Sequence, residues 1–334
     1  DPVNPTITCP TNTTVNTDIG ECDAAVTYSF PYAGDNCPGY TVTKLAGPNS
    51  GDEFALGTTS VSFKVTDPSG NNVTCAFTVT VEDKERPVIT KCPDPVVANT
   101  SVPTSGDCAG AVPSMTGALT ASDNCPTISV AQSPLANTIF GSAHGDVQIV
   151  TFTVTDNAGN TSSCQSSVKL NDNEAPSIVC TGLTTTYNVT AGFCGHLVVA
   201  ADNANPSFSD NCAGARRTHN LATAPNNNTL EGAVLPVGTT VVVWTITDVN
   251  NNATSCTVTY TVVDNIVPVF LNCPTANITV GNDVDKCGAN VFYLTPIADD
   301  NCSVTVTQQA GPLPGALFPV GTTLVSYKAT DPSG

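Results

Sequence analysis

Charged and aromatic side chains are scarce in this chain, and their scarcity excludes several classes of protein. Only 11% of the 334 residues are Asp, Glu, Lys or Arg, only 6% are aromatic, and Trp244 and Met115 are each the only residue of their kind. Helix-favouring Leu, Glu, Lys and Arg are few, whereas Thr, Val, Asn and Ser, which suit strands and turns, dominate. Ten basic residues against 28 acidic ones give a net charge of −18. This charge argues against a nucleic-acid partner and would attract cations.

Motifs of catalysis, zinc binding and membrane insertion are also missing from the sequence. No Gly-x-Ser-x-Gly, His-Glu-x-x-His, P-loop or Gly-x-Gly-x-x-Gly sequence occurs, and no Cys-x-x-Cys pair has zinc spacing. The three histidines, His144, His196 and His219, share no motif. No apolar run approaches the roughly 18 residues that a membrane helix needs. We therefore expect neither an enzyme nor a membrane span in this segment, which starts at Asp1 without a visible signal peptide and has the character of a mature or internal segment.

Cysteine, by contrast, is abundant: fifteen cysteines follow one pattern that recurs four times. The first members of successive sets lie 83, 88 and 93 residues apart, which is about one small domain. The pattern predicts four tandem modules, over residues 1–83, 84–172, 173–264 and 265–334, the last cut before its fourth cysteine. Repeated sets of four cysteines indicate an oxidising compartment, so we expect an extracellular protein that is secreted, on the cell surface or in a matrix. The sets are Cys9, Cys22, Cys37 and Cys75; Cys92, Cys108, Cys125 and Cys164; Cys180, Cys194, Cys212 and Cys256; and Cys273, Cys287 and Cys302.

Within a module, apolar residues alternate with polar ones as in half-buried strands. Residues 61–65 place Val, Phe and Val on one face, and residues 75–81 do the same with Cys, Phe, Val and Val. The sequence Asp67-Pro-Ser-Gly-Asn71 between them has strong turn chemistry. About seven short strands per module, with no helical periodicity, predict an all-β fold of tandem immunoglobulin-like antiparallel β-sandwich modules arranged end to end.

Four short motifs make the chain similar to one known family. They are Asp-Asn-Cys at residues 35–37, Gly-Thr-Thr-x-Val-x-Phe at 57–63, Thr-Asp-x-x-Gly-Asn at 66–71 and a closing Val-x-Asp-x-x-x-Pro at 81–87. These motifs resemble the hyalin repeat, or HYR, module, and the resemblance covers essentially the whole chain. It implies an extracellular protein with an immunoglobulin-like fold, associated with cell adhesion and extracellular matrix.

The cysteine pairing is open at this level, because four cysteines allow three pairings. In a sandwich of immunoglobulin type, the third and fourth cysteines of a module are expected at the same pole, which leaves the first to pair with the second. Cys302 would then have no partner, and the missing final strand of the last module would leave an open edge. We expect the parent chain to continue past Gly334; the alternative is a strand supplied by a neighbouring subunit. The predicted pairs are Cys37–Cys75, Cys125–Cys164 and Cys212–Cys256, followed by the weaker Cys9–Cys22, Cys92–Cys108, Cys180–Cys194 and Cys273–Cys287.

An Asp precedes by four residues the Pro that opens each module, and only three residues are expected between the last strand of one module and the first of the next. Linkers that short do not behave as flexible coil, so we expect a rod of stiffly joined modules. Acidic residues gather at the same joints, where the linker, the Asp-Asn-Cys loop and the Asp-x-x-Gly-Asn turn are expected to meet. Two interpretations stay open: the acids cap turns through their own backbone, which we favour, or they form calcium sites, since calcium takes six to eight oxygen ligands. One linker, residues 171–176, is also similar to the calcium-binding linker of cadherins. The candidate ligands are Asp83, Glu85, Asp123 and Asp156; Asp172, Glu174, Asp210 and Asp248; and Asp264, Asp299, Asp300 and Asp331.

Several Asn-x-Ser/Thr sequons predict N-linked glycans in a eukaryotic secreted protein. Those at Asn72, Asn160 and Asn252 are expected in the exposed turn before the fourth cysteine, whereas Asn301, with Cys302 in its middle position, is the poorest acceptor. The candidate acceptors are Asn12, Asn72, Asn99, Asn160, Asn188, Asn227, Asn252 and Asn277.

Two classes of function are compatible with these features. The first is a structural or adhesive protein, a stiff disulfide-stapled array that acts in cell adhesion, in a matrix or in a surface filament. Its partners would be other copies of itself or proteins of the matrix or cell surface, and it requires no cofactor beyond the calcium considered above. The alternative is a ligand- or glycan-binding ectodomain of a cell-surface receptor.

Overall fold

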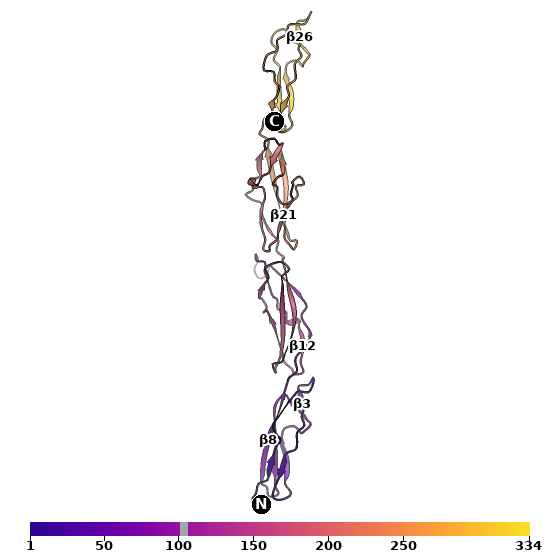
Figure 1. Ribbon diagram of the computed structural model, residues 1–334, viewed down its shortest axis with the longest axis vertical. Coiled ribbons are helices and arrows are strands. Elements are labelled where there is room, and N and C mark those ends of the chain that lie inside the picture. The colour runs from indigo at the N-terminus through magenta and orange to yellow at the C-terminus, as the bar shows by residue number, and fades with distance from the viewer. Residues whose placement is uncertain (101–105) are drawn as a thin grey trace. The chain divides into compact units, whose positions relative to one another are not determined.

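The computed structural model describes residues 1–100 and 106–334, and nearly all of its regular structure is β-strand (Figure 1). The chain divides into two compact units, Asp1–Asp172 and Asn173–Gly334, each of which is described by itself. The first unit holds the predicted modules 1 and 2, and the second holds modules 3 and 4. No helix in the described part of the chain is long and apolar enough to cross a membrane.

Module 1 is a sandwich of one four-stranded sheet and two two-stranded pairs. The large sheet has the order β2-β8-β7-β5, and the pairs β1–β4 and β3–β6 complete the module. The alternation expected for residues 61–65 and 77–81 is confirmed, because the apolar members are buried, and all of them except Val65 lie in one core cluster with Phe54. Its strands are β1 (Thr6–Thr8), β2 (Thr13–Asn16), β3 (Asp23–Ala25), β4 (Tyr32–Gly34), β5 (Thr41–Ala46), β6 (Glu53–Ala55), β7 (Gly57–Thr66) and β8 (Asn72–Glu82).

Modules 2 and 3 repeat this plan strand for strand. Their four-stranded sheets have the orders β10-β16-β15-β13 and β18-β24-β23-β21. Module 2 contains β9 (Val88–Lys91), β10 (Val96–Asn99), β11 (Gly110–Ala111), the 3-10 helix η1 (Thr116–Ala118), β12 (Thr120–Ser122), β13 (Ile128–Ser133), β14 (Ile139–Phe140), β15 (Val147–Asp156) and β16 (Thr161–Asn171). Module 3 contains β17 (Ser177–Val179), β18 (Thr186–Asn188), β19 (Gly195–Leu197), the 3-10 helix η2 (Ala200–Asp202), β20 (Ser207–Ser209), β21 (Arg216–His219), β22 (Val234–Pro236), β23 (Gly238–Thr247) and β24 (Ala253–Val263).

The all-β sandwich prediction is confirmed, with one pairing that differs from a purely antiparallel sheet. In each of modules 1 to 3 the last strand runs antiparallel to the strand before it but parallel to an early strand, as β8 does with β2. A parallel pair needs a connection that leaves the sheet and returns, and here the strands of the opposite layer make that connection. The early strand therefore forms one edge of the sheet, next to the last strand.

Module 4 retains part of the plan. Its pair β28–β30 has the same register shift as β5–β7, between Gln308 and Ala310 in place of Lys44 and Ala46. A groove of about 750 Å³ lies between residues 277–280 and 322–325, and Cys273 and Tyr327 also line it. In module 1, the segments that correspond to residues 277–280 and 322–325 both pair with β8. The strands are β25 (Val269–Phe270), β26 (Gly288–Asn290), β27 (Ala298–Asp299), β28 (Thr305–Ala310), β29 (Leu317–Pro319) and β30 (Ser326–Thr330).

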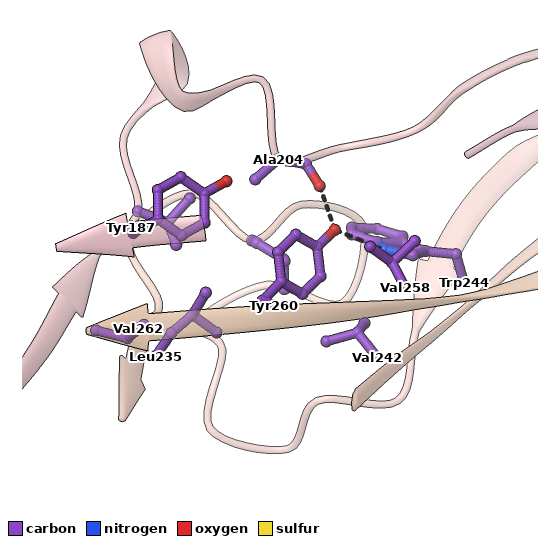
Figure 2. Close-up of a cluster of buried hydrophobic side chains, with 10 residues drawn as sticks. Tyr187, Ala204, Leu235, Val242, Trp244, Val258, Tyr260 and Val262 are labelled. Carbon is purple, nitrogen blue, oxygen red and sulfur yellow. Dashed lines mark hydrogen bonds between the residues drawn. The ribbon is translucent and has the colours of Figure 1, made fainter. Parts of the chain in front are cut away.

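The core of module 3 is built around Trp244, the only tryptophan of the chain. Trp244 and Tyr260 are fully buried on neighbouring strands, and the Trp244 indole N–H donates to the Tyr260 hydroxyl at 3.3 Å. That hydroxyl in turn donates to the carbonyl of Ala204, so the buried polar atoms are paired (Figure 2). Burial raises the pKa of Tyr260, in keeping with a phenol enclosed in an apolar core.

The linkers are somewhat longer than expected. Five residues, 83–87, separate β8 from β9, and 264–268 likewise separate β24 from β25, where three were predicted. The difference arises because the strands end one residue earlier than the Asp and begin only after the Pro, whose ring cannot donate to a ladder. The linkers remain short and are held by hydrogen bonds described below.

Candidate functional site

One class of disulfide lies within a module and joins its first and fourth cysteines. The first cysteine follows the first strand, and the fourth lies in the long last strand, with the two Cα atoms 5.7 Å apart in module 1. This class therefore ties the two layers of a sandwich together across its core. Its members are Cys9–Cys75, Cys92–Cys164 and Cys180–Cys256.

A second class of disulfide joins successive modules. It connects the second cysteine of one module with the third cysteine of the next: Cys22 bonds Cys125 in the first unit, and Cys194 bonds Cys302 in the second. The Cα atoms are 4.8 and 4.6 Å apart, and the cysteines are 103 and 108 residues apart in the chain. These bridges lock the joint between two modules.

The predicted disulfide pairs are wrong. In each unit the third cysteine of the later module lies in the loop that faces the earlier module, and it bonds the second cysteine of that module rather than a partner within its own sandwich. Cys302, expected to be unpaired, is bonded to Cys194. Among the described residues, Cys37, Cys273 and Cys287 are free, and Cys108 and Cys212 are both disulfide-bonded. The pairs overturned are Cys37–Cys75, Cys125–Cys164, Cys212–Cys256, Cys9–Cys22, Cys92–Cys108, Cys180–Cys194 and Cys273–Cys287.

The Asp-Asn-Cys motif of module 2 contacts module 1, and that of module 4 contacts module 3. In module 2, the Cys125 N–H donates to Asp123 Oδ2 at 3.1 Å, which fixes the loop. Asn124 Nδ2 reaches into module 1 and donates to the carbonyl of Glu21, the residue before Cys22, at 2.9 Å. The joint in the second unit is built alike, with the Asn301 amide donating to the carbonyl of Phe193 at 3.3 Å. Disulfide and amide thus hold the same turn.

Three carboxylates converge at the joint between modules 1 and 2. Asp83 from the linker, Asp123 from the Asp-Asn-Cys loop and Asp156 from the turn place one oxygen each within 4.8 Å of one another. Asp156 caps its turn: its two oxygens accept from the backbone and side-chain amides of Asn160, both at 2.8 Å. The Asn160 amide also donates to the carbonyl of Asp83, at 3.2 Å, so the turn holds the linker.

Turn capping explains the hydrogen bonds of Asp156, but several oxygen atoms of the neighbouring residues accept no hydrogen bond from the described residues. Asp83 is only 4% exposed, and although its Oδ1 accepts from the Glu85 N–H, its Oδ2 has no hydrogen-bond partner among the described residues. Asp123 Oδ1 and Asn124 Oδ1 are buried without a partner in the same way. Buried oxygens without a donor cost free energy, and three of them lie at this joint.

The pKa values of two carboxylates at this joint are shifted by their surroundings. Burial, followed by the nearby negative charges of Asp83 and Asp156, raises the pKa of Asp123 above its ordinary value. Burial acts to raise the pKa of Asp156 too, but the hydrogen bonds from Asn160 and the turn backbone outweigh it and lower that pKa. A raised pKa means that the folded joint binds the Asp123 proton more tightly than the unfolded chain does. The Asp123 contribution to stability therefore falls as pH rises from the ordinary Asp pKa through the raised one.

Acidic residues also gather at two other places within the units, although Cys302 stands in place of a third carboxylate in the second unit. Asp264, 8% exposed, meets Asp300 and Cys302 between modules 3 and 4, where Asp300 Oδ1 and Asn301 Oδ1 have no partner among the described residues. In module 1, Asp1, Asp35 and Asp67 form the third group.

The remaining candidate ligands have other surroundings. Glu85 accepts from the Gly20 N–H at 2.9 Å, Asp299 is exposed in β27, and Asp331 accepts from the Gly334 N–H. The predicted group of Asp172, Glu174, Asp210 and Asp248 spans the boundary between the two units and stays a prediction.

Comparison with known proteins adds the family. The HYR domain model matches residues 1–81 and 263–334. The chain contains HYR domains in these two segments. Along its whole length it is 32% identical to hyalin of Lytechinus variegatus, of which it spans 61%, and over 86% of its length it is 32% identical to hyalin of Strongylocentrotus purpuratus, of which it spans 23%. Cadherin domains 1–5 of protocadherin gamma B2 align over 93% of this chain and 74% of that one, with 14% identity and a TM-score of 0.34, which is too low to establish a shared arrangement.

The sequons of this HYR chain differ in exposure. Asn160 and Asn252, expected in an exposed turn, are half-buried, and their amides donate to Asp156 and Asp248 of the same turn. In folded protein secreted from eukaryotic cells, we therefore expect glycans at exposed sequons such as Asn72 and none at Asn160 or Asn252, since a sugar there would displace the turn. Glycopeptide mass spectrometry measures the occupancy of each site. Occupancy at Asn160 equal to that at Asn72 would contradict this expectation.

Proposed function

We propose that this chain is a structural segment of an extracellular adhesive or matrix protein, in which successive HYR modules are locked into a stiff array. Each joint is held by three parts: a short linker, an inter-module disulfide and a bound calcium ion. The disulfides support an oxidising, extracellular location, and the similarity to hyalin along the whole chain supports a role in adhesion or matrix. The chain acts mechanically and carries no catalytic residues in this role.

The observation that supports the calcium ion is a set of buried oxygen atoms that accept no hydrogen bond from the described residues. Asp83 Oδ2, Asp123 Oδ1 and Asn124 Oδ1 are partnerless at the same joint, beside the carboxylate of Asp156. All are hard oxygen ligands from three separate segments, which is the donor chemistry that calcium prefers; water and backbone carbonyls complete such sets in proteins. A divalent cation would also offset the repulsion that raises the pKa of Asp123.

Calcium binding at the joint would stabilise both modules together. A ligand that binds only the folded state, at a free concentration of 100 times its Kd, adds about 2.7 kcal/mol. Since the ion takes ligands from the linker, the loop and the turn, that free energy opposes separation of the modules as well as unfolding. The result is a joint that resists bending under load.

Calcium titration of the full chain tests the proposal, with the melting temperature and binding heat as readouts. We expect millimolar calcium to raise the melting temperature of the wild type by several degrees. The variant Asp123→Asn should reverse sign between conditions: more stable than wild type in chelator, because one repelling charge is gone, and less stable than wild type in calcium. Asp94→Asn, which removes an exposed carboxylate far from the cluster, is the matched control and should follow the wild type. A wild type with neither binding heat nor a thermal shift in calcium would refute the calcium joint.

A further inference from the structure

One half of the disulfide Cys22–Cys125 lies in the same loop as a candidate calcium ligand, at the joint between modules 1 and 2. Asp123 stands two residues before Cys125, and the Cys125 N–H donates to Asp123 Oδ2 at 3.1 Å. We propose that the bridge and calcium are coupled: the bridge holds the ligands in place, and reduction of the bridge by extracellular thiols weakens calcium binding. The proposal rests on the calcium joint proposed above and adds its regulation by thiols.

In module 2, the bridge fixes the loop that carries two of the unpartnered oxygens. Asn124 Nδ2 donates to the carbonyl of Glu21, the residue before Cys22, at 2.9 Å, and it contacts Cys125 Sγ at 3.7 Å. Asn124 Oδ1 is buried without a partner among the described residues, as is Asp123 Oδ1. Opening of the bridge therefore removes the covalent tie that holds these two oxygens against module 1.

On the side of module 1, the turn that carries Cys22 holds the linker carboxylate through Glu85. The Gly20 N–H donates to Glu85 Oε1 at 2.9 Å, and the Glu85 N–H donates to Asp83 Oδ1 at 3.0 Å. Asp83 is 4% exposed, and its Oδ2 is the atom that has no partner in the described part of the chain. Glu85 is therefore a positioning residue, which connects the cysteine turn to the candidate ligand Asp83.

The two halves of the bridge thus restrain ligands that come from the linker and from module 2. The Cα atoms of Cys22 and Cys125 are 4.8 Å apart, although the cysteines are 103 residues apart in the chain. Ligands that are already held in their bound arrangement lose less conformational entropy when the ion binds, so the bridge raises the affinity for calcium. Because linkage is reciprocal, calcium opposes reduction of the bridge by the same factor, and couplings of this kind are typically about 5- to 150-fold.

The joint between modules 3 and 4 provides an internal comparison, because it has the inter-module bridge but no carboxylate at the position of Glu85. Ile266 takes the place of Glu85, two residues after the linker Asp, and its N–H donates to Asp264 Oδ1 at 3.2 Å. The apolar side chain of Ile266 offers no acceptor to the turn of Cys194. Of these two joints, the first alone therefore connects its cysteine turn to the linker through a side-chain carboxylate.

Reduction proceeds by thiol–disulfide exchange with two molecules of a monothiol such as glutathione. One glutathione thiolate attacks the sulfur of Cys22, which is half-buried whereas Cys125 is 4% exposed, and the Cys125 thiolate leaves. A second glutathione thiolate attacks the glutathione sulfur of this mixed disulfide, and the Cys22 thiolate leaves. The bridge is reduced to two protein thiols, two glutathione thiols are oxidised to glutathione disulfide, and their two protons pass through solvent to the protein thiolates.

Equilibration of the full chain in mixtures of reduced and oxidised glutathione, in calcium or in chelator, tests the coupling. Alkylation followed by peptide mass spectrometry measures the reduced fraction of Cys22 and Cys125. In the wild type we expect calcium to raise the value of [reduced glutathione]²/[oxidised glutathione] at half-reduction by about tenfold. Asp123→Asn, which keeps an oxygen for the Cys125 N–H, should lose this shift, and the exposed control Asp94→Asn should retain it.

Two variants of Glu85 separate a positioning role from a direct effect of its charge. Glu85→Gln keeps Oε1 as an acceptor for the Gly20 N–H, so it should retain most of the calcium-dependent shift, whereas Glu85→Ala should lose most of it. Equal loss in the two variants would mean that Glu85 acts through its charge, and would overturn its positioning role.

Calorimetric calcium titration of the same samples separates failure of the coupling from failure of the calcium joint. Binding heat in the wild type without a shift in bridge reduction overturns the coupling and leaves the calcium joint intact. Absence of binding heat overturns both. A shift in Asp123→Asn as large as that in the wild type also overturns the coupling, because calcium would then act at another place.

Discussion

Replacement of Trp244 by alanine is expected to lower the free energy of unfolding of module 3 by about 3–5 kcal/mol, the range for large aromatic side chains lost from a core. The indole is fully buried in the core cluster of module 3, so its removal leaves a cavity among the side chains around it (Figure 2). Arg217 lies over the ring at 5.3 Å from its centroid, and the His219 ring packs against the indole in a T-shaped arrangement with the ring centroids 4.9 Å apart. The variant also removes the donor to the Tyr260 hydroxyl. Urea unfolding followed by circular dichroism measures the loss.

The matched control is Val241→Ala, in the same strand as Trp244 but on its solvent face. Val241 is 56% exposed, so its replacement should cost less than about 1 kcal/mol, mainly through strand preference. Modules 1 and 2 form a separate compact unit and should retain their transition in both variants. Equal losses from the two changes, or a loss spread over the whole chain, would contradict a core that is local to module 3.

The strands could be predicted from sequence because alternation is a local signal. Val61, Phe63 and Val65 are polar-flanked apolar residues, and a strand with one buried face is the arrangement that places all three inside. The core positions of the long strands follow from the same pattern. The parallel pairing of β2 with β8 could not be read in this way, because four residues of a short strand specify a face but not a neighbour.

The disulfides between modules do not follow from one module taken alone, because each of these bridges takes its cysteines from two modules. The same argument that placed the Asp-Asn-Cys loop at the pole facing the preceding module also implies that its cysteine bonds a residue of that module. Cys125 and Cys302 do so. The signal was present, therefore, in the position of Asp123 and Asn124 beside the cysteine, and only the assumption of self-contained modules concealed it.

The position of the acidic groups, unlike the disulfides, follows from the sequence motifs. Three motifs far apart in sequence were assigned to one pole, and the structure brings Asp83, Asp123 and Asp156 together there. What sequence could not distinguish is which oxygens turn capping consumes. Both oxygens of Asp156 accept from Asn160, whereas one oxygen of Asp83 has no partner among the described residues, and that difference depends on hydrogen-bond directions rather than on residue types.

Removal of the intra-module disulfide Cys180–Cys256 by a double alanine change is expected to lower the free energy of unfolding of module 3 by roughly 4 kcal/mol. The bridge closes a segment of 76 residues in sequence separation, and without it the unfolded chain gains the conformational freedom of that loop. Both cysteines also pack against the core, and Cys256 lies directly across the ladder from Trp244. Fluorescence of Trp244, the only tryptophan, therefore follows the transition of this module selectively in urea.

The inter-module bridge Cys194–Cys302 provides the comparison that separates the two classes of disulfide. Its double alanine variant should leave the Trp244 transition within about 1 kcal/mol of wild type, because neither cysteine belongs to the core cluster of module 3. Its effect should fall on the joint instead: limited proteolysis is expected to cut residues 264–268 faster in this variant than in the wild type. If loss of the inter-module bridge destabilised module 3 as much as loss of Cys180–Cys256, the bridge would be a staple of the sandwich. An unchanged core with an opened joint is the result that a lock between modules requires.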